Sequence, residues 1–252
     1  MELSRYLDRI GFHEPVAATA DVLQKMQAAH LLSVPFENLS IGVGEEIVLA
    51  EGWLYEKIVT RRRGGFCYEL NGLFAWALRE MGFYVEMLSA GVCRPDGAWG
   101  PEFDHMTLVV GLEERWVVDV GFGDSSRKPL ALDGGARNDG FGDYQIGCDE
   151  EGRRVLRRKD LSDGAWRDLY RFDLEPRVLG DYAEMCRWQQ TSPDSFFAKG
   201  RLCSLALPDG RITISGDRLI TTEDGVKTER ELADEADYRA VLRERFGIVM
   251  PA

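Results

Sequence analysis

Hydrophobic residues in the first third of the chain recur at helical spacing. Within 3–10 and 21–32 they fall on one face of a helix, and the clearest pattern predicts a helix over 70–81 that ends at Gly82. The apolar positions of this third helix follow an i, i+3, i+4, i+7 spacing and are Leu70, Leu73, Phe74, Ala77, Leu78 and Met81. The chain up to residue 84 is therefore expected to be mainly helical.

The periodicity changes near residue 84, where helical spacing gives way to short β-type runs punctuated by glycine. In order these runs are YVEMLSAGV, HMTLVV, RWVVDVGF, DYQIG, RRVLRRK and WRDLYRF. Between about 85 and 172 they predict a small antiparallel barrel or sandwich.

The last part of the chain mixes both patterns. A helical stretch near 178–188 precedes two hairpin-like runs, in which Pro-Asp-Gly and Glu-Asp-Gly supply the turns, and EADYRAVLRERFG predicts a closing helix. Helices followed by strands and then by a mixed segment indicate an α+β protein rather than a doubly wound sheet.

Composition excludes several classes of protein. No apolar run reaches the roughly 18 to 20 residues of a bilayer span, and the N-terminus mixes charged with apolar residues, so we expect a soluble, cytoplasmic protein without a signal peptide. A formal net charge of −12 disfavours binding to nucleic acid. The five cysteines are widely spaced and form no C-x-x-C pair, which argues against a disulfide scaffold and a structural zinc site. We expect no bound metal.

One cysteine has a distinctive setting. In RRRGGFCYELNGLF, residues 61–74, Cys67 follows two glycines and precedes the predicted helix, so it lies in or just before the first helical turn. There the unpaired N–H groups and the helix dipole lower the pKa of a thiol and can hold an oxyanion. The alternative is an inert buried cysteine, which is the usual state of this residue. We assign the alternative to Cys93, Cys148, Cys186 and Cys203.

A nucleophilic cysteine needs a base, and the chain has three histidines. His13 follows the first predicted helix in a turn and is expected to be exposed. His30 falls on the apolar stripe of the second helix and is expected to be structural. His105 instead opens a strand, which makes it the candidate base.

Strand parity links His105 to Asp119. If a five-residue loop over 111–115 joins the two strands, Val110 faces Trp116, and His105 and Asp119 are diagonal neighbours on one face. Any odd loop length gives the same parity, whereas a two- or four-residue loop would separate the two side chains. On the first register the carboxylate can orient the imidazole towards the cysteine.

These segments resemble the arylamine N-acetyltransferase family, and the resemblance spans nearly the whole chain. It rests, in order, on YLDRIGF, HLLSVPFENLSI, RRRGGFCYELNGLF, VVDVGFG and TSPDSFFAKGRLCSL. The resemblance implies a catalytic triad of Cys67, His105 and Asp119, related to those of papain-like proteases and transglutaminases. It also implies a helical first domain over 1–84 that carries the nucleophile, an antiparallel β-barrel over 85–187 that carries the histidine and aspartate, and an α/β lid over 188–252.

The implied reaction is a ping-pong acetyl transfer, typical of xenobiotic metabolism. Acetyl-CoA donates its acetyl group to the cysteine, and an arylamine, arylhydrazine or N-hydroxyarylamine then accepts it. By resemblance the acceptor pocket is lined by Phe36, Phe122 and Phe197, for which the alternative is ordinary core filling. Coenzyme contacts are implied at Phe103, Asp104, Gly121, Gly123, Trp188, Thr191, Ser192 and Lys199. The protein is expected to be a monomer or a homodimer.

Further family positions are interpreted as structural. Glu37, Asn38, Glu69 and Asn71 are expected to cap or hold the loops that carry Phe36 and Cys67. Arg63 is expected to pair with one of these carboxylates and so secure the Gly-Gly turn.

Two rival enzyme functions use the same residues, and a third alternative is a non-catalytic binding protein with a degenerate site, which the filled triad positions disfavour. Some members of the family are amide synthases that act on a polyketide thioester, and the triad does not distinguish them. A cysteine protease or transglutaminase would share the triad but needs an open peptide cleft, and the C-terminal segment favours a covered pocket.

Overall fold

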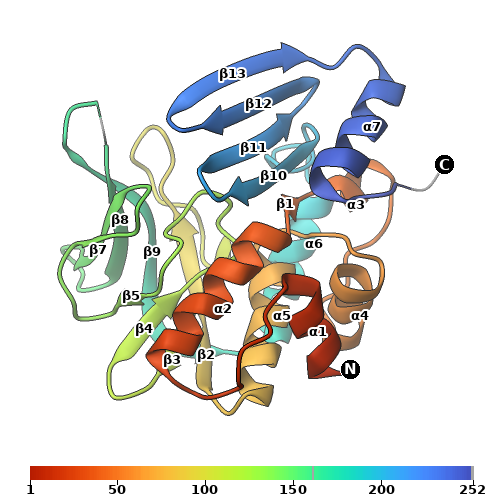
Figure 1. Ribbon diagram of the computed structural model, residues 1–252. Helices are drawn as coiled ribbons and strands as arrows, with labels where there is room; N and C mark the ends of the chain where they lie inside the picture. The colour runs from red at the N-terminus through yellow and green to blue at the C-terminus, as the bar shows by residue number, and fades with distance from the viewer. Residues whose placement is uncertain (161, 251–252) are drawn as a thin grey trace.

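Helices dominate the chain up to residue 82, as the hydrophobic spacing predicts (Figure 1). The computed structural model describes residues 1–160 and 162–250. The elements of this first part are α1 (Leu3–Ile10), α2 (Ala20–Ser33), β1 (Phe36–Glu37), α3 (Leu39–Gly42), α4 (Glu51–Tyr55), a π-helical turn η1 (Glu56–Thr60) and α5 (Cys67–Glu80).

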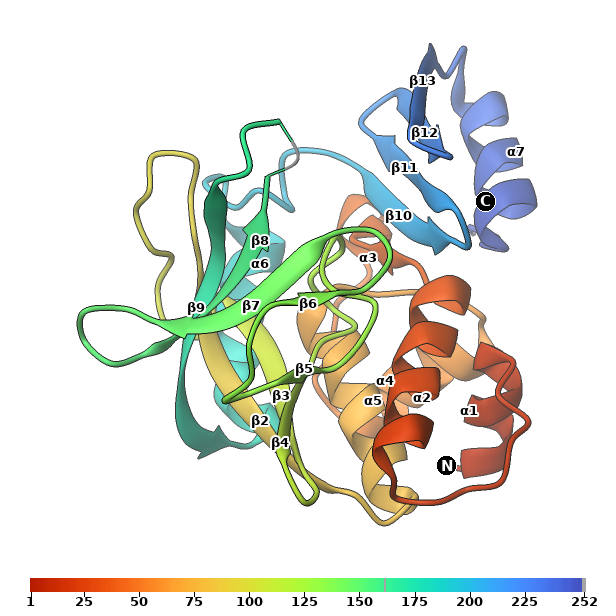
Figure 2. The ribbon, with the colours of Figure 1, turned by 60° about the vertical axis from the view of Figure 1, so that its left-hand side comes forward.

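The central helix α5 is buried along almost its whole length. Every residue from 67 to 78 is buried, and the helix lies between the N-terminal helices and strands β2 and β3 (Figures 1 and 2). It begins at Cys67, three residues before the predicted stripe, because the Glu69 carboxylate accepts a hydrogen bond from the Phe66 N–H (3.1 Å) and caps the first turn.

An eight-stranded antiparallel sheet packs against α5. Its spatial order is β5-β4-β3-β2-β9-β8-β7-β6. The strands are β2 (Tyr84–Val92), β3 (His105–Gly111), β4 (Arg115–Val118), β5 (Leu130–Ala131), β6 (Arg137–Asn138), β7 (Asp143–Cys148), β8 (Arg154–Lys159) and β9 (Trp166–Arg177).

The predicted register of the β3–β4 hairpin is confirmed. Val110 pairs with Trp116, but Gly111 also pairs with Arg115, so the loop has three residues rather than five and the parity is the same. The second strand ends at Val118, so Asp119 lies just past it and not within it as the sequence suggested.

A second, five-stranded sheet covers one end of the molecule together with α7 (Glu235–Phe246) (Figure 2). Its order is β1-β10-β11-β12-β13, so β1 from the N-terminal part joins strands from the C-terminal part. A 3₁₀ turn η2 (Leu179–Tyr182) and α6 (Ala183–Thr191) precede β10 in the chain. The four C-terminal strands of the five-stranded sheet are β10 (Leu202–Leu207), β11 (Gly210–Ser215), β12 (Arg218–Glu223) and β13 (Val226–Glu231).

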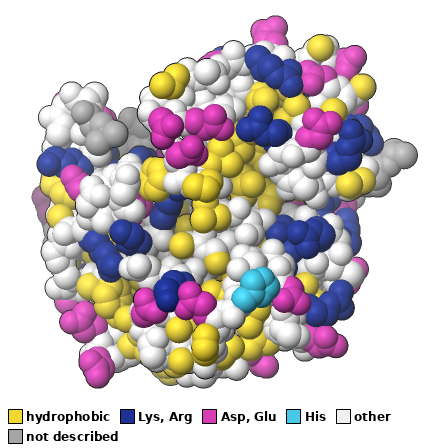
Figure 3. All heavy atoms as spheres, viewed as in Figure 1, with side chains coloured by type: hydrophobic (Ala, Val, Ile, Leu, Met, Phe, Trp, Pro, Cys, Tyr) yellow, Lys and Arg dark blue, Asp and Glu magenta, His cyan; other side chains and the backbone are white. Residues whose placement is uncertain are grey.

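These elements confirm the α+β class with an antiparallel barrel-like sheet. None of the helices in residues 1–160 and 162–250 is both long and apolar enough to cross a bilayer. On the face seen in Figure 3, acidic and basic side chains are intermixed around hydrophobic ones.

Buried ion pairs anchor the segment that leads into α5. Lys57 Nζ lies 2.7 Å from Glu69 Oε1, and the Arg63 guanidinium lies 2.9 Å from Glu37 Oε1, as the sequence predicted for Arg63. All four side chains are almost fully buried. Burial raises the pKa of Glu69, and Lys57 opposes this shift.

Replacing Lys57 by methionine is expected to lower the free energy of unfolding by about 3–5 kcal/mol, because it leaves the Glu69 carboxylate buried without a cation. Urea denaturation measures the change. Lys57→Met should be compared with Lys25→Met, which removes the exposed ion pairs of Lys25 with Glu14 and Asp21 and should change stability little. Equal, small effects of the two substitutions would contradict this role for Lys57.

Candidate active site

A cavity of about 640 Å³ opens where the start of α5, the beginning of β3 and the segment after α6 meet. Cys67 and His105 both line it. Its aromatic lining residues are Phe36, Phe122, Trp188, Phe196 and Phe197. The volume and the apolar lining are typical of a small-molecule site.

Cys67 is the first residue of α5 and is only 4% exposed. Burial raises the pKa of its thiol, the Asp119 and Asp104 carboxylates act in the same direction, and a hydrogen bond from the Met106 backbone opposes them. The net direction is opposite to the lowering expected from a helix start alone, because burial is the largest effect. The sulfur therefore needs a nearby base to become a thiolate.

His105 and Asp119 form a buried hydrogen bond of 2.7 Å between Nε2 and Oδ2. Since the carboxylate accepts, Nε2 carries the proton, and Nδ1 is left as the basic atom of the ring. Burial alone would raise the pKa of Asp119, but the His105 ring and hydrogen bonds from Asn71 and Gly121 hold that pKa below its usual value.

Asn71 fixes this carboxylate from the next turn of α5. Its Nδ2 donates to Asp119 Oδ1 (2.9 Å) and to the Met106 carbonyl (2.6 Å), while its Oδ1 accepts from the Val120 N–H (2.9 Å). The sequence suggested only a structural role for Asn71, and its contact with Asp119 was missed. These bonds also explain why β4 stops, since Val120 donates to a side chain and not to a strand.

Two aromatic rings pack against the imidazole and against each other. The Tyr170 and Phe122 rings lie 4.9 and 5.2 Å from the His105 ring, and the Tyr170 hydroxyl is 3.1 Å from Thr107 Oγ1. Tyr170 was not singled out in the sequence. Only its alternation with Phe172 along β9 could have indicated that it points inward.

The other two histidines lie outside this cavity. His30 is fully buried, with Nδ1 2.7 Å from the Tyr6 hydroxyl, and burial lowers the pKa of His30 to about 3. It is neutral and structural, as predicted. His13 is exposed, also as predicted.

Residues with predicted coenzyme or acceptor contacts fall into two groups. Those that line the cavity are Phe36, Asp104, Gly121, Phe122, Trp188 and Phe197. Phe103, Gly123, Thr191, Ser192 and Lys199 do not line it. Within this second group, Phe103 has a left-handed backbone (φ 63°) and its carbonyl accepts from the Tyr68 hydroxyl (2.7 Å).

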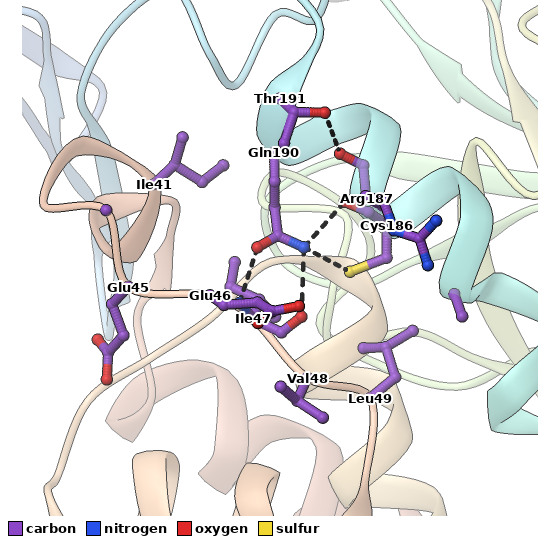
Figure 4. Close-up of a pocket in the computed structure, with 12 residues that line it drawn as sticks. Ile41, Glu45, Glu46, Ile47, Val48, Leu49, Cys186, Arg187, Gln190 and Thr191 are labelled. Atoms are coloured by element: carbon purple, nitrogen blue, oxygen red, sulfur yellow. Dashed lines mark hydrogen bonds between the residues drawn. The ribbon is translucent and has the colours of Figure 1, made fainter.

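Thr191 faces a second cavity of about 510 Å³ on the other side of α6 (Figure 4). There Gln190 holds α6 against the extended segment 44–49. Its Oε1 accepts from the Ile47 N–H (2.7 Å) and its Nε2 donates to the Ile47 carbonyl (3.2 Å). None of Cys67, His105 and Asp119 lines this cavity. The hydrogen bonds of Gln190 beside it hold the helix that carries Trp188.

Comparisons with known proteins agree on one family. A family model described as N-acetyltransferase matches residues 19–252. The arylamine N-acetyltransferase of Escherichia coli is 34% identical over 251 residues, which cover 98% of this chain and 88% of the relative.

Two solved structures are similar along their whole length. The arylamine N-acetyltransferase of Mycobacterium marinum in complex with CoA has a TM-score of 0.90 and 32% identity, covering 98% of this chain and 93% of the other. An arylamine N-acetyltransferase of Bacillus cereus, described as having a unique Cys-His-Glu catalytic triad, has a TM-score of 0.91 and 25% identity, covering 99% of this chain and 100% of the other.

Proposed function

The chain belongs to the arylamine N-acetyltransferase family, and from this premise we propose that it transfers acetyl from acetyl-CoA to aromatic amines through an acetyl-Cys67 intermediate. The acceptors include arylamines, arylhydrazines and N-hydroxyarylamines. Family membership supports an acyltransferase, and the CoA complex of the Mycobacterium marinum relative supports coenzyme A as the carrier.

The observation that carries the proposal is the hydrogen bond between Asp119 and His105, whose ring lines the same cavity as Cys67. A buried thiol, an imidazole with one free basic nitrogen and a carboxylate that accepts from the other nitrogen are the components of a nucleophilic triad. We assign the triad to Cys67, His105 and Asp119.

In the first stage, His105 Nδ1 takes the proton of the Cys67 thiol. This transfer is needed because burial raises the pKa of that thiol, and Asp119 stabilises the imidazolium that results. The sulfur then attacks the acetyl carbon, the carbon–sulfur bond to coenzyme A breaks, and the proton on Nδ1 passes to the departing coenzyme A thiolate.

In the second stage, the nitrogen of the aromatic amine attacks the acetyl carbon on Cys67. His105 Nδ1 accepts the proton of the amine, and the carbon–sulfur bond breaks to release the amide. The proton then passes from Nδ1 to the Cys67 sulfur and restores the thiol. The aromatic walls formed by Phe36, Phe122 and Phe197 favour a flat aryl group and exclude water from the acetyl-cysteine.

Coenzyme contacts are proposed for the residues that the family resemblance implies. Trp188, Gly121 and Asp104 line the cavity itself. Phe103, Gly123, Thr191, Ser192 and Lys199 would act around its entrance. Lys199 is exposed and donates to the Asp194 carbonyl (3.3 Å), so a phosphate group would have to displace that contact.

Two-substrate kinetics test the proposal. With acetyl-CoA and 4-methoxyaniline, we expect parallel double-reciprocal plots and release of free coenzyme A before the amine reacts. Intersecting plots would contradict an acetyl-enzyme. Failure with these substrates but turnover of a polyketide thioester would indicate an amide synthase, and cleavage or crosslinking of casein would indicate a protease or transglutaminase.

Gly121→Ala is expected to lower kcat/KM roughly a hundredfold, because an added Cβ would lie 2.7 Å from Cys67 Cα and 2.9 Å from the Cys67 carbonyl oxygen. The backbone at the nucleophile would have to shift. Gly135→Ala is the matched control, since its added Cβ meets nothing within 4 Å, and it should retain full activity. Steady-state rates with 4-methoxyaniline measure both, and an unchanged Gly121→Ala enzyme would contradict the close approach.

A further inference from the structure

Three charged side chains line the cavity that holds Cys67, and only one of them is half-buried. Arg94 and Asp194 are exposed, whereas Asp104 is partly shielded from solvent. Asp104 precedes His105 directly, and its charge is close enough to Cys67 to raise the pKa of the thiol. The inner part of the cavity is therefore under the influence of a carboxylate.

The hydrogen-bond partners of this carboxylate are neutral. Gln189 Nε2 donates to Asp104 Oδ1 (3.0 Å), and the Val92 N–H lies 3.4 Å from Oδ2. Within residues 1–160 and 162–250, no lysine, arginine or histidine forms an ion pair with Asp104. Burial raises the pKa of Asp104. The two hydrogen bonds and the charges of His105 and Arg94 act in the opposite direction but do not cancel the increase.

A partly buried carboxylate without a directly paired cation is electrostatically unfavourable, and a ligand that brings a positive charge into contact with it reduces the imbalance. A ligand that brings a second carboxylate makes it worse. Since Cys67 and Asp104 line the same cavity, an acceptor whose amine reaches the cysteine is within the range of this field.

We infer that Asp104 selects acetyl acceptors by charge, favouring aryl amines with a cationic group and disfavouring those with a carboxylate. The positive charge must lie away from the reacting nitrogen, because that nitrogen attacks only when unprotonated. The inference rests on the proposed function and adds the substrate class to it.

A purely structural role is the competing explanation. Through Gln189 and Val92, Asp104 also connects α6 with the end of β2. The substitution Asp104→Asn separates the two roles, because it keeps the size and an oxygen acceptor for Gln189 but removes the charge. Asp104→Glu keeps the charge.

The test uses three acceptors of similar shape at pH 7, namely 4-aminobenzamidine, 4-aminobenzamide and 4-aminobenzoate. The wild type should acetylate the amidine with a higher kcat/KM than the benzoate. Asp104→Asn should reduce the ratio of kcat/KM for the amidine to kcat/KM for the benzoate roughly ten- to hundredfold, and 4-aminobenzamide serves as the neutral reference. Asp104→Glu should keep the preference for the amidine. Asp194→Asn, at an exposed carboxylate of the same cavity, should change the ratio less.

A second readout does not require acetyl transfer. Benzamidine should protect Cys67 from alkylation by iodoacetamide better than benzoate does in the wild type, and the difference should vanish in Asp104→Asn. If no acetyl-enzyme forms but this difference is seen, the proposed function fails while the charge selection holds. A wild type that prefers the benzoate in both readouts, or an Asp104→Asn ratio equal to that of the wild type, would overturn the inference.

Discussion

Replacing Cys67 by alanine is expected to lower kcat/KM for acetyl transfer by about 10⁴- to 10⁶-fold. The variant has no sulfur to carry the acetyl group, and the remaining imidazole and aromatic walls can only bind and orient the substrates. Cys67 is 4% exposed at the start of a buried helix. Because the substitution removes only the sulfur atom, the variant should still fold. Formation of the N-acetyl product measures the rate, and circular dichroism checks the fold.

Cys203→Ala is the matched control for this variant. Cys203 is also buried, but it lies in the core beneath the five-stranded sheet and does not line the cavity. Its replacement should cost some stability and leave the rate of acetyl transfer close to that of the wild type. Comparable losses of activity in both variants would indicate that Cys67 acts only by packing.

Asp119→Asn is expected to lower kcat by about 10⁴-fold with little change in structure. Asn71 Nδ2 and the Gly121 N–H both donate to Oδ1, so the oxygen of the introduced amide should stay there and its NH₂ group should face His105 Nε2. The imidazole must then accept at Nε2 and carry its proton on Nδ1, which removes the base for Cys67.

Steady-state kinetics with 4-methoxyaniline measure this effect. Asp133→Asn, at an exposed carboxylate that pairs with Arg115 and Arg154, is the control and should be fully active. A loss of less than tenfold in Asp119→Asn would show that the tautomer of His105 does not limit the reaction.

Periodic features of the sequence predicted the parts of the fold that depend on local pattern. The helical stripe that begins at Leu70 gave α5, and the parity of the hairpin gave the pairing of Val110 with Trp116. The same parity brought His105 and Asp119 to hydrogen-bond distance even though the loop is shorter than expected. Parity survives an error of two residues in loop length, which is why this prediction was robust.

Other features depend on contacts that no local pattern encodes. The short elements α3, α4 and the π-helical turn η1 carry too few residues for a recognisable stripe. The bond between Thr107 and Tyr170 joins positions 63 residues apart, and Gln190 holds Ile47 across 143 residues. A helix start predicts a lowered pKa for Cys67, but the sequence does not indicate the depth of burial that raises it.

The most direct measurement is the intact mass of the folded protein after mixing with acetyl-CoA alone, followed by peptide mapping. The wild type should gain one acetyl group on Cys67 and lose it when an aromatic amine is added, and Cys67→Ala should gain none. A folded wild type that gains no acetyl group in the presence of intact acetyl-CoA, or gains it at another residue, would contradict an acetyl-cysteine mechanism.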